Sequence, residues 1–205
     1  MMNWLWVGGW GVDPEALKNW ATNNFPSANH FVILPARLDR LDGKFDHVIG
    51  WSWGGFRVLE YLLGDFVSKV TPAITLVAPF LGFCSEDGLG GKCSRIHVNV
   101  LKRWMARNPI DALRDFYQRA GLPFEIPSGH NKNISFWASE LDKIIKEKLD
   151  LHKTKEALAK TNSRILVGEF DPLVDASWLA ENLDAIKCTN KNHDITMFSE
   201  LILIK

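Results

Sequence analysis

The 205-residue chain is long enough for one well-buried domain and short for two, and 46% of its residues are hydrophobic. Its formal net charge is zero, so the molecule as a whole has no field to attract nucleic acid or a membrane surface. No apolar run approaches the length of a membrane span, and we therefore expect neither nucleic acid nor membrane as a partner.

The three cysteines, Cys84, Cys93 and Cys188, follow no metal-ligand spacing, so we expect no metal and no other cofactor. Reduced thiols are typical of a cytoplasmic protein. A bridge between Cys84 and Cys93 would require a secreted protein, and the first residues contain neither a basic leader nor a small-residue cleavage site. We predict a cytoplasmic location.

Strand and helix patterns alternate along the first 78 residues. Asp13 and Pro14 predict the start of a first helix, because Asp suits the N-cap and Pro the first helical position. A second helix is predicted after Ser52. Short apolar runs predict buried strands at 4–7, 31–34, 46–49 and 73–78. Near-continuous apolar strands separated by helices indicate an α/β fold, with a mostly parallel sheet covered by helices on both faces.

Residues 80–162 interrupt this alternation without a clear linker. A glycine-rich loop is predicted at its start, followed by helices at about 95–120, broken near Pro109, and at about 134–160. We therefore expect one domain, 1–205, with a helical cap inserted at about 80–162. Beyond the cap the pattern predicts a strand at 164–168, a helix from about 174 to 183, a weak strand near 185–188 and an amphipathic piece at 193–205.

The predicted strand at 46–49 leads into Gly50-Trp51-Ser52-Trp53-Gly54, a G-x-S-x-G pentapeptide, and then into the second helix. A serine on so tight a strand-to-helix turn has a strained backbone, which pushes its hydroxyl out above the sheet edge. We predict that Ser52 is a nucleophile. The alternative is a structural turn whose serine only caps the helix.

A serine hydroxyl needs a base to take its proton, and the base needs an acceptor that fixes its tautomer. The sequence offers Asp171 after a late strand and His193 in a polar loop, giving the order Ser, acid, His that is expected with a nucleophile elbow. We predict the triad Ser52, Asp171 and His193. Asp175 and Glu169 are the alternative acids.

Five other histidines compete with His193 for the role of base. His130 is the only rival in a loop, but it belongs to the predicted cap. The others fall in strand, cap or charged-helix patterns and are interpreted as structural: His30, His47, His97 and His152.

An oxyanion intermediate needs preorganised backbone N–H donors. We assign one to Trp53, which follows the nucleophile, and the other to Trp10 in the glycine-rich turn 8–11. A phosphate-binding loop at 8–11 is the alternative, but the full G-x-G-x-x-G spacing and a Walker lysine are absent. Four aromatic residues are predicted to line an acyl slot: Trp10, Trp51, Trp53 and Phe83.

These motifs together resemble the α/β-hydrolase superfamily. Within it the chain is most similar to the pimeloyl-acyl-carrier-protein methyl ester esterases of biotin synthesis, which show a G-W-G loop and a W-S-x-G elbow. The matching residues are 9–11, 50–55, 171–174 and His193 with Phe198-Ser199. The resemblance implies a serine esterase acting on a carrier-linked methyl ester. Two departures are the missing N-terminal antiparallel strands and Gly8 in place of a histidine.

The resemblance also implies an acidic acyl carrier protein as partner. Residues 92–119 hold seven cations and two anions, a local charge of +5 in a neutral chain, which could steer such a partner. Arg103, Arg107 and Arg114 are the candidate carrier-binding residues; the alternative is a solvated helix face. We expect a monomer. Two other functions stay open: a short-chain carboxylesterase without a carrier, and a hydrolase-fold binding protein whose triad is not assembled.

Overall fold

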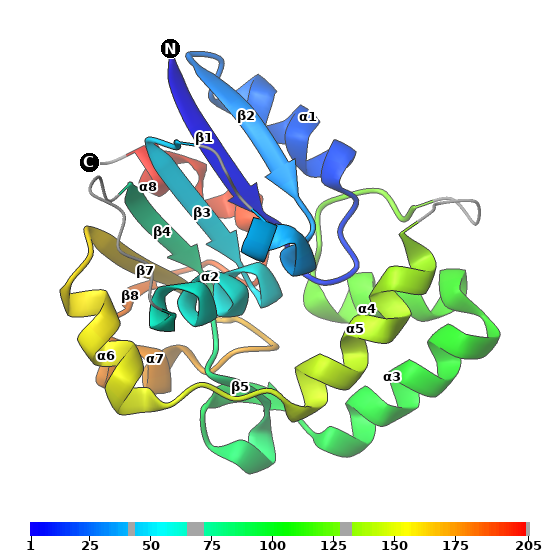
Figure 1. The fold of residues 1–205 in the computed structure, drawn as a ribbon. Helices are drawn as coiled ribbons and strands as arrows, with labels where there is room; N and C mark the ends of the chain where they lie inside the picture. The colour runs from blue at the N-terminus through cyan, green and yellow to red at the C-terminus, as the bar shows by residue number, and fades with distance from the viewer. Residues whose placement is uncertain (41–43, 65–71, 128–132, 204–205) are drawn as a thin grey trace.

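The computed structural model describes residues 1–40, 44–64, 72–127 and 133–203, and a central parallel sheet runs through it (Figure 1). The strand order is β2-β1-β3-β4-β7-β8, and all five neighbouring pairs are parallel. The strands are β1 (Met2–Val7), β2 (Ala28–Ile33), β3 (His47–Trp51), β4 (Ala73–Val77), β7 (Ser163–Gly168) and β8 (Ile186–Cys188). This confirms the predicted fold class, and it brings the carboxyl ends of all the strands to one edge.

Alternating side chains of β1 supply the two cores of the molecule. Trp4 and Trp6 pack on one face of the sheet, whereas Leu5 and Val7 pack on the other. The helices α1 (Pro14–Asn24) and α8 (Ser199–Leu203) cover the tryptophan face, and α2 (Trp53–Leu63) and α7 (Ala176–Leu183) cover the other. Burial of apolar side chains on both faces explains the near-continuous apolar strands of the sequence.

The structure confirms the predicted start of α1, since Asp13 accepts a hydrogen bond from the amide of Glu15 and Pro14 is the first helical residue. β3 runs two residues beyond the predicted strand, to Trp51, and so reaches the elbow. A short 3-10 helix, η1 (Pro35–Arg40), follows β2 and was not predicted. The amphipathic end of the chain forms η3 (Ile195–Phe198) and α8.

The prediction of a glycine-rich loop after Phe80 is wrong. A two-stranded parallel sheet forms there from β5 (Gly82–Cys84) and β6 (Gly90–Cys93), joined by the 3-10 turn η2 (Ser85–Asp87). The glycines allow the strands to approach: a Cβ on Gly91 would lie 2.0 Å from the carbonyl oxygen of Phe83. They therefore mark close contact between strands as well as a turn.

The predicted helices at 95–120 and 134–160 form four separate helices: α3 (Arg95–Arg107), α4 (Pro109–Ala120), α5 (Ile134–Lys146) and α6 (Leu151–Ala159). The second stretch breaks because Asp150 accepts a hydrogen bond from the amide of Lys153 and caps α6. α6 packs against α2, beside the sheet, whereas α3, α4 and α5 lie together beyond the strand ends (Figure 1). We refer to α3, α4 and α5, the part of the predicted cap 80–162 that lies beyond the strand ends, as the cap helices.

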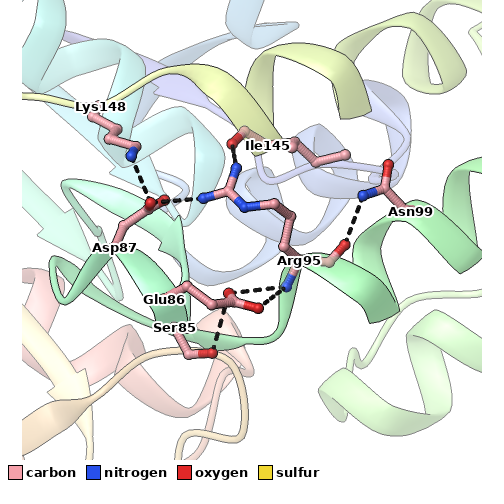
Figure 2. Close-up of polar contacts among 7 residues, drawn as sticks. All are labelled: Ser85, Glu86, Asp87, Arg95, Asn99, Ile145 and Lys148. Carbon is pink, nitrogen blue, oxygen red and sulfur yellow. Dashed lines mark hydrogen bonds and ion pairs between the residues drawn. The ribbon is translucent and has the colours of Figure 1, made fainter.

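A buried acidic side chain ties the base of the cap together (Figure 2). Asp87 Oδ1 lies 2.7 Å from Arg95 Nη2 and 2.6 Å from Lys148 Nζ, and the Asp87 side chain is only 4% exposed. Arg95 also donates to the carbonyl oxygen of Ile145, near the end of α5, at 2.8 Å. Glu86 accepts from the Arg95 amide. The start of α3 and the end of α5 are thereby fixed to η2.

Within the described ranges, no helix is long and apolar enough to cross a bilayer.

Candidate active site

Ser52 lies between the end of β3 and the start of α2, with φ 56° and ψ −119°. A positive φ at a non-glycine residue stores strain of the kind found at functional sites. The amide of Ser52 donates to the carbonyl oxygen of Val77 at 2.9 Å, and the side chain makes no capping hydrogen bond to α2. The structure therefore does not support the alternative of a serine that caps the helix.

The glycine next to the elbow makes this turn possible. A Cβ on Gly54 would lie 2.0 Å from the carbonyl oxygen of Val7, which no packing can accommodate. α2 therefore starts in direct contact with the end of β1, beside the glycine-rich turn 8–11. The same requirement explains Gly50, whose Cβ would lie 2.9 Å from the Cα of Gly55.

His193 is bound to Asp171: its Nδ1 lies 2.7 Å from Asp171 Oδ2, and each residue is only 1% exposed. Asp171 Oδ1 accepts from the amides of Leu173 and Val174 at 2.8 and 2.9 Å, so the carboxylate cannot rotate away. A carboxylate only accepts, so Nδ1 carries the proton. In the neutral ring Nε2 is then the free base.

The rival acids and bases have other places. Asp175 caps α7, with Oδ1 accepting from the amides of Ser177 and Trp178 at 3.0 Å each, and Glu169 is exposed. His130 lies outside the described residues. The remaining histidines bond to structural partners or face solvent: His30 with Trp6 and Phe25, His47 with Thr75, His152 near Glu156, and exposed His97.

Trp51 connects the elbow to the loop that carries His193. Its Nε1 donates to the carbonyl oxygen of His193 at 3.0 Å, and the two rings are 6.0 Å apart. The end of β7 touches the same loop, since a Cβ on Gly168 would lie 2.4 Å from the carbonyl oxygen of Asn192. Ser52, Asp171 and His193 therefore lie at the same edge of the sheet, contributed by β3, the β7 end and the last loop.

The turn after β1 passes directly against the nucleophile. A Cβ on Gly9 would lie 3.5 Å from the Cβ of Ser52. Trp53 is the first residue of α2, where a backbone N–H has no partner within the helix. The turn 8–11 therefore passes beside Ser52, and the assignment of the Trp10 and Trp53 amides to an oxyanion hole stays a prediction.

The aromatic residues predicted to line an acyl slot all have protein neighbours. The indoles of Trp10, Trp51 and Trp53 donate to Trp137 O, His193 O and Glu140 Oε2, and Phe83 packs on Phe80 with ring centroids 5.0 Å apart. Trp51 is 1% exposed and lies in the core on the tryptophan face. Its observed role is to support the His193 loop. Contact of these four residues with a substrate stays a prediction.

Sequence reasoning did not identify the supporting contacts of the site. Lys92 Nζ donates to the carbonyl oxygen of Asp171 at 2.7 Å, and Trp137 and Glu140 of α5 hold two indoles beside the elbow. The partners of these bonds lie 79 to 127 residues apart in the chain, so no local pattern predicts them.

The thiol of Cys93 does not compete with Ser52 as a nucleophile. All three cysteines are free, and burial, with smaller effects of nearby Cys84 and Asp171, raises the pKa of Cys93 to about 11. A thiol with so high a pKa holds almost no thiolate near neutral pH. In the part of the chain that the structure describes, no three His, Cys, Asp or Glu side chains are grouped to hold a metal ion.

No protein-family profile and no curated protein sequence matches the chain. Solved structures do match it: an esterase from Exiguobacterium antarcticum (15% identity, 99% of this chain and 91% of that one, TM-score 0.62) and an esterase from Rhodococcus sp. (17%, 98% and 88%, 0.60). A structure from a study of carboxylesterases of Nitrososphaera gargenis matches with 12% identity over 98% and 85%, TM-score 0.62.

The order of the parallel strands, the strained serine between β3 and α2, and the similarity to these structures over nearly the whole length lead to one conclusion: the chain has the α/β-hydrolase fold.

Proposed function

We propose that the chain is a serine carboxylesterase with Ser52 as nucleophile, His193 as base and Asp171 as the acid that orients it. The observation that carries the proposal is the buried 2.7 Å bond between His193 and Asp171 at the sheet edge that holds strained Ser52. The esterases from Exiguobacterium antarcticum and Rhodococcus sp. support it as neighbours of the same fold.

In the proposed reaction, Ser52 Oγ attacks the ester carbonyl carbon while His193 Nε2 takes its proton. Asp171 stabilises the imidazolium, and the amides of Trp10 and Trp53 bind the oxyanion. His193 then returns the proton to the departing alkoxide, and the alcohol leaves. Water, deprotonated by His193, attacks the acyl-enzyme, releases the carboxylic acid and regenerates Ser52.

Ser52→Ala tests the chemistry, since it removes only one oxygen atom. We expect ester turnover to fall by several orders of magnitude, with the unfolding transition retained, because the attacking group is gone while binding groups remain. The measurement is kcat/KM for p-nitrophenyl butyrate together with a urea unfolding curve. Turnover retained in the folded variant would remove Ser52 from the mechanism.

The substrate that we propose is the methyl ester of a pimeloyl chain on an acyl carrier protein, as in biotin synthesis. The outward face of α3 supports a protein partner: Ile96, Val100 and Trp104 are 71%, 45% and 36% exposed at a spacing of four residues. Arg103 and Arg107 are exposed on the same helix, which would suit an acidic partner with some apolar surface. Arg114 forms an ion pair with Asp111, so its charge is already partly neutralised.

Charge reversal separates a carrier-linked ester from a small soluble one. We expect Arg103→Glu/Arg107→Glu to lower kcat/KM for the carrier-linked ester about tenfold or more and to leave p-nitrophenyl butyrate turnover within about twofold, because steering acts only on the charged partner. Lys153→Glu/Lys155→Glu on α6 is the matched control, with the same change of charge at exposed positions. Equal losses on both esters would instead favour a short-chain carboxylesterase without a carrier.

A further inference from the structure

Both residues assigned to the oxyanion hole are bound through their indoles to a single helix, α5. Trp10 Nε1 donates to the carbonyl oxygen of Trp137 at 2.7 Å, and Trp53 Nε1 donates to Glu140 Oε2 at 2.8 Å. Trp137 and Glu140 are three residues apart, so they lie on the same side of α5, the yellow-green helix of Figure 1. The cap is therefore hydrogen-bonded to both halves of the proposed oxyanion hole.

Glu140 is an unusual residue at this position. It is 2% exposed, and its second oxygen, Oε1, lies 3.1 Å from Lys143 Nζ, one turn along α5. A carboxylate is costly to bury unless both of its oxygens have partners, and here the indole and the ammonium group supply them. A hydrogen bond from an indole to a carboxylate is also shorter and stronger than one between neutral groups.

The bond adds a directional contact to the packing of the Trp53 ring. Trp53 stacks on Phe56 with ring centroids 4.6 Å apart and planes at 22°, and on Phe80 at 6.2 Å and 15°. Stacking favours particular arrangements of two rings, whereas a hydrogen bond also fixes the direction of its donor. The bond to Glu140 therefore holds the indole nitrogen of Trp53, the first residue of α2, in one direction.

We infer that Glu140 is a positioning residue for the oxyanion hole: through the Trp53 indole it holds the backbone amide that binds the oxyanion. This inference rests on the proposed esterase function and adds which residue aligns one of the two oxyanion donors. Oxyanion donors act only when they lie within hydrogen-bond distance of the developing charge, so a small shift of the Trp53 backbone weakens catalysis while substrate binding is little changed.

Three variants on α5 test the inference, with p-nitrophenyl butyrate as substrate. Glu140→Leu removes the acceptor, Glu140→Gln keeps an acceptor oxygen without the charge, and Asp142→Leu removes a carboxylate that pairs with Lys102. We expect Glu140→Leu to lower kcat about tenfold or more with KM within about threefold. Glu140→Gln and Asp142→Leu should stay within about threefold of the unchanged protein in kcat.

Two results would overturn the inference: a folded Glu140→Leu variant with unchanged kcat, or a Glu140→Gln variant that loses as much as Glu140→Leu. If Glu140→Leu does not give a cooperative urea transition, Trp53→Phe removes the donor instead. Its kcat should fall similarly, and adding Glu140→Gln should cost nothing further; an additive loss would contradict the coupling. If the unchanged protein hydrolyses no ester and forms no fluorophosphonate adduct, the proposed function itself fails.

Discussion

The conformation of Ser52 illustrates how single residues define this site. A backbone held at φ 56° costs on the order of 1–3 kcal/mol, so the surrounding contacts must enforce it. They do so through the Val77 carbonyl bond and the close passage of Gly54 against Val7. At His193 the Asp171 carboxylate, which two amides hold in place, determines which ring nitrogen is protonated. Both arrangements exist before a substrate arrives, which is what a preorganised site requires.

His47, at the opposite end of the sheet, predicts a pH dependence of stability. Burial, with a smaller effect of the Arg164 charge, lowers its pKa from about 6.5 to about 4. Below pH about 6.5 the unfolded chain binds a proton at His47 that the folded chain does not bind. The contribution of neutral His47 to the free energy of unfolding is therefore fully present above pH about 6.5 and is lost as the pH falls toward 4. Between pH 7 and pH 5 this amounts to about 2 kcal/mol.

His47→Gln checks this prediction, because it removes the titrating ring and keeps a polar side chain. Urea unfolding near pH 7 and pH 5 should show a smaller loss of stability in the variant than in the unchanged protein, whatever their difference near pH 7. Identical losses in the two proteins would show that His47 does not titrate between the folded and unfolded states.

The sequence predicts which polar residues lie at the same sheet edge better than it predicts the contacts that support them. Ser52, Asp171 and His193 each follow or neighbour a strand pattern, and the carboxyl ends of parallel strands converge, so order along the chain indicates proximity. Trp51 and Glu140 show no such signal. From the sequence, Trp51 is assigned to the acyl slot next to the nucleophile, and Glu140 is given no role on its predicted helix. Their supporting roles come from hydrogen bonds across more than 80 residues, which no local pattern reveals.

At the scale of elements, the cap was the hardest part to predict. Glycines 82, 88, 90 and 91 indicate a loop by composition, yet Gly91 allows β6 to approach β5 and Gly90 allows it to approach α7. The break between α5 and α6 depends on the Asp150 cap inside a charged run that continues the helical pattern. By contrast, the inner strands of the sheet were predictable because they are buried on both faces and lie between clear helix patterns.

The polar cluster at the base of the cap gives a stability prediction for these elements. Asp87→Asn keeps the size of the side chain but leaves Arg95 and Lys148 facing a neutral group, so we expect a loss of about 1–3 kcal/mol. The value is below that of a fully buried pair because the Arg95 and Lys148 side chains are 36% and 46% exposed. Urea unfolding measures it.

Asp142→Asn is the matched control, since Asp142 also lies 2.6 Å from a lysine but is 45% exposed. Its effect on the urea midpoint should be small, because exposed ion pairs contribute little. If the two variants behave alike, burial of Asp87 does not determine the strength of the cluster.

At the scale of the whole molecule, the parallel sheet brings the residues of the proposed site to one edge. The matched esterases share only 15% and 17% identity with the chain, yet the matches extend over 91% and 88% of the lengths of these esterases. The fold is therefore retained while most side chains differ. A sheet with every neighbouring pair parallel brings residues 9, 52, 171 and 193 to one edge. A cap helix over that edge can then act on the site through two indoles.

Covalent labelling tests the central claim most directly. A fluorophosphonate should phosphonylate Ser52 of the native protein, because the attacking hydroxyl, the base and the oxyanion donors must all be in place for the reaction. Peptide mass mapping should place the adduct on Ser52 alone, with labelling lost in Ser52→Ala and strongly slowed in His193→Ala. An unlabelled native protein, or an adduct at another residue, would contradict the account.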